Sequence, residues 1–151
     1  MADVALVTGG GRGLGRAACA ALAASGMTVA VADLDPAGVQ ETAQALPRPG
    51  RHRALAADVR DEAAVAALFD SVERDLGPVR VLATFAGILI APEGRRTGIA
   101  ETTVADWTRT FEVNALGTFL CLREMLRRRR AAAVAQGRII TVGSIAGQNG
   151  G

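Results

Sequence analysis

A glycine-rich stretch, TGGGRGLG at residues 8–15, lies between a short apolar run and an alanine-rich segment with helical spacing. Peptide N–H groups at the start of a helix attract negative charge, and glycines let a diphosphate approach them closely. We expect that side chains at Gly9, Gly13 or Gly15 would obstruct that approach. The stretch therefore predicts a phosphate-binding turn between a strand and a helix.

An acidic residue, Asp33, directly follows the next apolar run, TVAVA at residues 28–32. An acid at the end of the second strand can accept hydrogen bonds from adenosine ribose hydroxyls and repel a 2′-phosphate. Together with the glycine-rich turn, Asp33 predicts a dinucleotide site that prefers NAD to NADP. Arg12 could meet a 2′-phosphate, which weakens that preference.

Four further motifs follow in order: ADV at 57–59, FAG at 85–87, VNALGTF at 113–119 and GSIAG at 143–147. With the spacing Thr-Gly-x-x-x-Gly-x-Gly in the turn, they resemble the short-chain dehydrogenase/reductase family over essentially the whole chain. The resemblance implies a Rossmann-like fold and hydride transfer between a nicotinamide cofactor and a carbonyl or alcohol substrate.

The resemblance also implies roles for individual residues. Ser144 and Asn114 stand at the family's catalytic serine and asparagine positions, and Asp58 stands where the family contacts the adenine ring. Phe85 is a departure, because the family usually has asparagine there. The residues expected to bind the cofactor are Gly9, Gly11, Arg12, Gly13, Leu14, Gly15, Asp33, Leu34, Asp58, Val59, Ala86 and Gly87.

The family's proton-transfer groups are missing from the sequence. The family uses a tyrosine, whose phenol needs a nearby cation to act as a base near neutral pH, and a lysine one helical turn later. This chain contains no tyrosine, and all 17 of its basic residues are arginine. We therefore expect the cofactor-binding front part of a longer dehydrogenase, truncated before the Tyr-x-x-x-Lys helix and inactive by itself. A complete short protein is the alternative.

The elements that must position these residues alternate along the chain. Strands are expected at residues 4–8, 28–32, 52–57, 79–85 and 137–142, and helices at 14–25, 36–46, 61–76 and 103–133. Asp35 and Asp61 are the expected N-caps of the second and third helices. This alternation predicts one domain over residues 1–151, a doubly wound parallel sheet of order 3-2-1-4-5, incomplete at its C-terminus.

The helix expected at 103–133 is apolar on two sides. One stripe contains Trp107, Phe111, Ala115, Thr118, Leu122 and Met125, and the other contains Val113, Leu116 and Leu120. A helix with two apolar faces needs two partners. We expect one partner to be the sheet and the other a missing helix or a second subunit, so the full-length protein is expected to form a homo-oligomer through this helix.

Composition excludes several functions. The net charge of +2 does not indicate nucleic-acid binding, and the RRRR run at 127–130 is interpreted as a solvated helix end. Cys19 and Cys121 are expected to be buried, and His52 is not expected to build a metal site. No stretch suits a signal peptide or a membrane helix, so we expect a cytoplasmic protein without a metal.

Two other functions remain open at this stage. The chain could be a non-catalytic dinucleotide-binding or protein-interaction module that uses the long helix, or a Rossmann-like methyltransferase, which also has an acid after the second strand. The substrate cannot be inferred, although Arg95 or Arg96 in the loop at 88–100 could contact an anionic one.

Overall fold

The computed structural model describes residues 3–89, 98–131 and 137–144. The strands are β1 (Val4–Thr8), β2 (Thr28–Asp33), β3 (Arg53–Ala56), β4 (Val79–Thr84) and β5 (Arg138–Thr141). The helices are α1 (Gly13–Ala24), α2 (Pro36–Ala45), α3 (Glu62–Leu76), α4 (Val104–Phe111), the π-helical segment η2 (Glu112–Gly117) and α5 (Thr118–Ala131).

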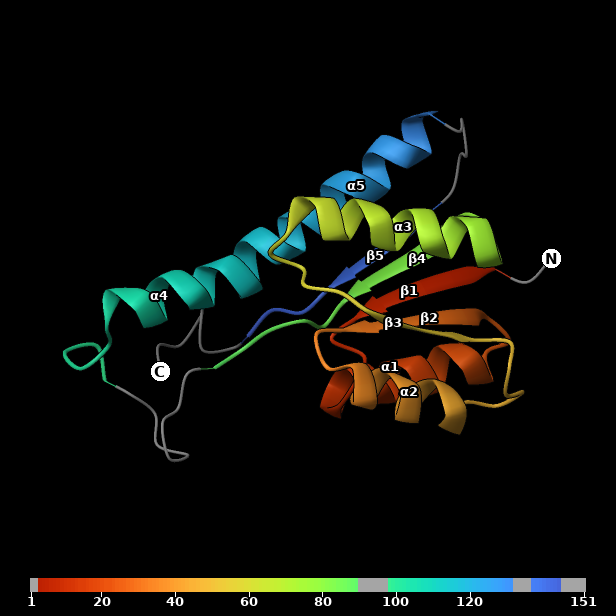
Figure 1. Cartoon of the computed structure of the whole chain (residues 1–151), viewed down its shortest axis with the longest axis horizontal. Coiled ribbons are helices and arrows are strands. Elements are labelled where there is room, and N and C mark those ends of the chain that lie inside the picture. The colour runs from red at the N-terminus through yellow and green to blue at the C-terminus, as the bar shows by residue number, and fades with distance from the viewer. Residues whose placement is uncertain (1–2, 90–97, 132–136, 145–151) are drawn as a thin grey trace.

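The five strands form one parallel sheet of order β3-β2-β1-β4-β5, which confirms the predicted fold class and strand order. Helices α1 and α2 cover one face of the sheet, and α3 and α5 cover the other (Figure 1). Apart from the exposed Arg80 in β4, the three central strands are mostly apolar and buried on both faces, as expected of a parallel sheet between two helical layers. All strands run in the same direction, so their carboxyl ends meet at one edge.

Side chains of the residues before α2 and α3 bond to free peptide N–H groups in the first turns of these helices. The Asp35 carboxylate accepts a hydrogen bond from the Ala37 N–H at 3.0 Å. The Asp61 carboxylate accepts from Ala63 at 2.8 Å and from Ala64 at 3.2 Å. Both predicted N-caps are therefore confirmed.

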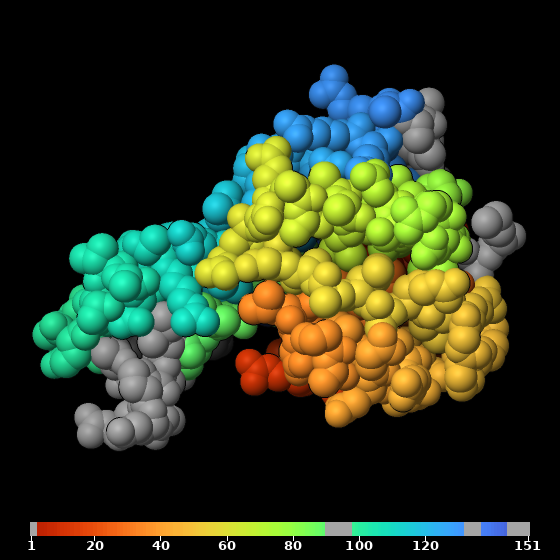
Figure 2. All heavy atoms as spheres, viewed as in Figure 1, coloured from red at the N-terminus to blue at the C-terminus, as the bar shows by residue number. Residues whose placement is uncertain are grey.

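The helix predicted at 103–133 is divided into α4, η2 and α5, and its residues 132–133 lie outside the described ranges. A π-helical turn inserts an extra residue, so it changes which side chains face the sheet. The predicted stripes are therefore wrong: Leu120 and Met125, assigned to different stripes, belong to the same core between the sheet and α3. Trp107 and Phe111 are about half exposed on α4, which extends beyond the sheet and its covering helices (Figure 2).

The interpretation of residues 127–130 as a solvated helix end is wrong for Arg128. Its side chain is 22% exposed and bonds to Glu124 at 2.7 Å, Asp70 at 2.8 Å and Glu73 at 3.2 Å. Burial disfavours its charge, but the hydrogen bonds to these carboxylates outweigh burial and raise the pKa of Arg128. Its guanidinium also lies over the Phe69 ring, so Arg128 ties α5 to α3.

The other residues considered for chemistry have structural roles. Cys19 and Cys121 are buried free thiols, as predicted, and burial raises the pKa of each to about 12. Nδ1 of His52 accepts a hydrogen bond from the Val29 N–H at 3.0 Å, and its Nε2 lies 2.8 Å from the Pro47 carbonyl oxygen. Within the described residues, no helix has the length and apolar character that a membrane crossing requires.

Candidate functional site

A cavity of about 660 Å³ opens at the carboxyl ends of β1, β2 and β4. Figure 2 shows the surface hollowed between the glycine-rich turn that leads into α1 and the segment after β4. All the residues expected to bind a cofactor line this cavity: Gly9, Gly11, Arg12, Gly13, Leu14, Gly15, Asp33, Leu34, Asp58, Val59, Ala86 and Gly87. The fold thus brings together side chains from four separate loops.

The glycine-rich turn is packed against itself more tightly than the sequence suggested. A Cβ atom on Gly9 would overlap the backbone of Phe85 and Ala86, and one on Gly15 would overlap the Gly9 carbonyl. At Gly13 a Cβ would meet no described atom within 4 Å, but its φ of +55° favours glycine. Gly9 and Gly15 are therefore needed by the turn itself, and the obstruction of a ligand by side chains at these positions stays a prediction.

The side chains of Arg16 and Thr42 stabilise this turn through hydrogen bonds to its backbone carbonyls. Arg16 donates hydrogen bonds to the Gly11 carbonyl at 2.6 Å and to the Thr42 hydroxyl at 2.9 Å. The Thr42 hydroxyl is buried and donates to the Gly10 carbonyl at 3.0 Å. The turn is therefore fixed to α2 as well as to the sheet.

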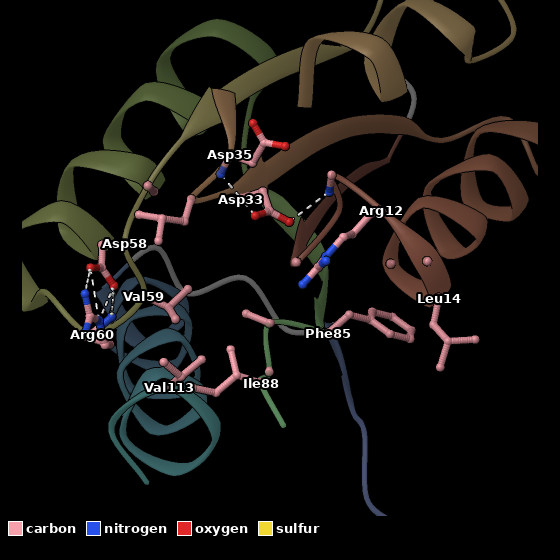
Figure 3. A pocket seen from close by; sticks show the side chains of 18 of the residues that line it. Arg12, Leu14, Asp33, Asp35, Asp58, Val59, Arg60, Phe85, Ile88 and Val113 are labelled. Carbon is pink, nitrogen blue, oxygen red and sulfur yellow. Dashed lines mark hydrogen bonds and ion pairs between the residues drawn. The ribbon is translucent and has the colours of Figure 1, made fainter. Parts of the chain in front are cut away.

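Asp33 links the turn to the end of β2. Its Oδ2 accepts a hydrogen bond from the Gly11 N–H at 3.0 Å, and its Oδ1 accepts from the Asp35 N–H at 3.2 Å (Figure 3). Each carboxylate oxygen can accept a second hydrogen bond. The carboxylate thus holds the turn and keeps acceptor capacity at the cavity.

Asp58 lies on the cavity wall and is bound by Arg60, a residue that the sequence analysis did not single out. The guanidinium donates to the carboxylate through Nε at 3.0 and 3.1 Å and through Nη2 at 2.6 Å (Figure 3). Hydrogen bonding by Arg60 lowers the pKa of Asp58. Arg60 also lies 3.8 Å from the Glu112 carboxylate, so it connects the loop after β3 with η2.

Asn114 and Ser144 do not line the cavity in the part of the chain that the structure describes. The Asn114 amide, in η2, pairs with the backbone of Ile88: its Oδ1 accepts from the N–H at 2.8 Å, and its Nδ2 donates to the carbonyl at 2.9 Å. Ile88 itself lines the cavity. Ser144 is exposed just beyond β5, so the structure places Asn114 beside the cavity and leaves Ser144 outside it.

Other cavity residues were missed as site candidates. Arg109 precedes Val113 by one helical turn, a spacing that could have indicated a shared face. The described lining also includes Ala57 and Phe85, which lie within the ADV and FAG motifs, and Asp35, Arg60 and Ile88, of which the last two directly follow those motifs. Arg95 and Arg96 lie outside the described residues. In the described part, no group of three or more His, Cys, Asp or Glu is placed to hold a metal ion.

Comparison with known proteins decides the family. The profile described as short chain dehydrogenase matches residues 3–151. The chain belongs to the short-chain dehydrogenase family. It is 35% identical over 147 residues to 2,3-dihydro-2,3-dihydroxybenzoate dehydrogenase of Bacillus subtilis, a match that covers 93% of this chain and 52% of that protein.

Two further short-chain dehydrogenase matches agree. Cis-4-hydroxycyclohexanecarboxylate dehydrogenase of Sinomonas cyclohexanicum is 38% identical, with 97% of this chain and 57% of the relative covered. The crystal structure of sorbitol-6-phosphate 2-dehydrogenase from Erwinia amylovora superposes with a TM-score of 0.86 at 34% identity, over 97% of this chain and 56% of that one. The chain thus spans about half the length of the curated relatives it matches.

The residues of this short-chain dehydrogenase fit the nicotinamide dinucleotide that its family implies. Asp35, Asp61 and Thr103 cap α2, α3 and α4, whereas no side chain in the described part caps α1. The uncapped N-terminus of α1 borders the cavity through Gly13, Leu14 and Gly15. Free N–H groups at a helix start suit a diphosphate, and the remaining acceptor capacity of the Asp33 carboxylate suits hydroxyl donors such as those of a ribose.

Proposed function

We propose that the 151 residues form one dinucleotide-binding domain of an NAD(P)-dependent oxidoreductase. The observation that carries the proposal is the uncapped N-terminus of α1 at a cavity that also contains the Asp33 carboxylate. The N–H groups of α1 would hold the diphosphate, and Asp33 would accept hydrogen bonds from the adenosine ribose. When bound, the nicotinamide supplies or accepts hydride at a small carbonyl or alcohol substrate.

We propose NAD as the preferred cofactor. A 2′-phosphate near the Asp33 carboxylate would meet a like charge, and the Gly11 and Asp35 N–H groups hold that carboxylate in place. Arg12 lines the same cavity and is the available counter-charge for NADP. The carboxylate lies at the end of β2, whereas Arg12 is an exposed side chain at the N-cap of α1.

For catalysis, we propose from the family resemblance that the Ser144 hydroxyl, which lies outside the cofactor cavity, donates a hydrogen bond to the substrate oxygen. Asn114 would act by positioning, because its amide fixes Ile88 in the loop after β4. The chain contains neither tyrosine nor lysine, so it has no phenol whose pKa a nearby amine could lower. We therefore expect these residues alone to bind the cofactor without appreciable turnover.

The test is calorimetric titration of the 151-residue chain with NAD⁺ and NADP⁺. We expect NAD⁺ to bind more tightly. Asp33→Asn removes the charge but keeps the shape, so it should weaken NAD⁺ binding by about tenfold, the size of one charge-assisted hydrogen bond. It should leave NADP⁺ binding unchanged or improved. Asp61→Asn, at the N-cap of α3 and not among the residues that line the cavity, is the matched control. Absence of NAD⁺ binding at millimolar concentration would refute the proposal.

A further inference from the structure

The cavity has two unlike sides. Asp33, Asp35 and Asp58 provide its acidic side, and Leu14 and Phe85 form an apolar wall elsewhere on its lining. Further apolar lining residues are Val59, Ile88 and Val113. Figure 3 shows Leu14 and Phe85 together, away from Asp58 and its arginine partner. Since the acidic side suits the adenosine hydroxyls, the apolar wall needs a different ligand group.

Core packing accounts for only part of the apolar wall. Leu14 is 73% exposed in the first turn of α1. Phe85 is half-buried: it packs against the core between the sheet and helices α1 and α2, and it also lines the cavity. Its N–H donates to the Thr8 carbonyl at 2.9 Å, a backbone bond that any residue other than proline would make. The Phe85 side chain thus borders both the core and the cavity, and its cavity-facing part can contact a ligand.

The topology indicates which part of a dinucleotide reaches this wall. The adenosine ribose belongs at Asp33, at the end of β2, and the diphosphate at the start of α1. Beyond the diphosphate, the ligand continues across β1 towards β4, because dinucleotides cross the carboxyl edge of such sheets. Phe85 directly follows β4, so a nicotinamide half that extends past β1 would reach the apolar wall.

We propose that Phe85, with Leu14, is a cofactor-contacting residue that binds the nicotinamide ring of the dinucleotide, an inference that rests on the proposed function. The planar nicotinamide packs on an aromatic and an aliphatic side chain, as flat rings do on apolar surfaces. The family usually has an asparagine here, so this contact belongs to this chain's own sequence.

The experiment compares NAD⁺ with ADP-ribose, which lacks the nicotinamide, in fluorescence or calorimetric titrations of the 151-residue chain. Phe85→Asn is expected to raise the NAD⁺ dissociation constant about five- to tenfold, the size of one aromatic contact. It is expected to change that of ADP-ribose less than about twofold, within the scatter of single-site effects. Phe85→Leu keeps an apolar side chain, so it should raise the NAD⁺ dissociation constant less than Phe85→Asn does. Phe119→Asn, at an exposed phenylalanine outside the cavity lining, is the matched control.

The outcomes separate this inference from the proposed function. If Phe85→Asn weakens NAD⁺ and ADP-ribose equally, the ring supports the fold of the site and does not contact nicotinamide, and the inference fails. It also fails if neither ligand is affected. If the unmodified chain binds neither ligand, the proposed function is refuted, and the inference that rests on it is refuted too.

Discussion

Replacing Gly15 with alanine tests whether the glycine-rich turn needs glycine for its own packing. A Cβ at this position would overlap the Gly9 carbonyl oxygen, which belongs to the backbone and cannot rotate away. The Gly9 segment is in turn packed against the backbone of Phe85 and Ala86. The added methyl group must therefore displace the turn from the end of β4.

The magnitude follows from two opposing effects. Forcing a methyl group into a well-packed site costs up to about 3 kcal/mol. Alanine gains about 1 kcal/mol over glycine inside a helix, and Gly15 lies within α1. The net loss of unfolding free energy is therefore about 2 kcal/mol, which corresponds to a decrease in Tm of about 4–8 °C for a chain of this size.

The assay is urea and thermal unfolding followed by circular dichroism, with NAD⁺ titration in parallel. Gly143→Ala is the control, because a Cβ there would meet no described atom within 4 Å. That variant should be neutral or more stable by about 0.5 kcal/mol, since alanine restricts the unfolded chain. If Gly15→Ala keeps its Tm and only weakens NAD⁺ binding, the glycine serves ligand clearance and the packing argument is refuted.

The remaining predictions concern the core. Arg128→Ala is expected to lower the unfolding free energy by about 2 kcal/mol, because it removes charge-assisted hydrogen bonds between α5 and α3. Arg127→Ala, at a side chain that is 58% exposed, should change it by less than about 0.5 kcal/mol; equal effects of the two variants in urea unfolding would contradict this assignment. Cys19 and Cys121, with pKa values raised to about 12, are expected to react with a thiol reagent at neutral pH only after unfolding. Reaction in the native state at the denatured rate would show that burial does not protect them.

Local pattern was enough to predict the strands and helix starts of this chain. Strands buried on both faces are continuous apolar runs, and Asp35 and Asp61 were recognisable as caps because a cap acts over two or three residues. Pattern could not predict η2, since the sequence carries no periodic signal for a single π-helical segment. The end of η2 is closely packed: a Cβ on Gly117 would lie 2.6 Å from Cγ2 of Val59.

The sequence by itself determined the family, the strand order and which loops gather around the cavity, because the carboxyl ends of parallel strands share one edge. Only the tertiary structure showed that Arg60 binds Asp58, that Asn114 fixes Ile88, and that Phe85 joins Leu14 on one wall. The Asp58–Arg60 contact depends on side-chain directions within one loop, whereas the other two depend on the distance between elements far apart in sequence. A motif gives the type and spacing of its residues, whereas packing decides what each of them touches.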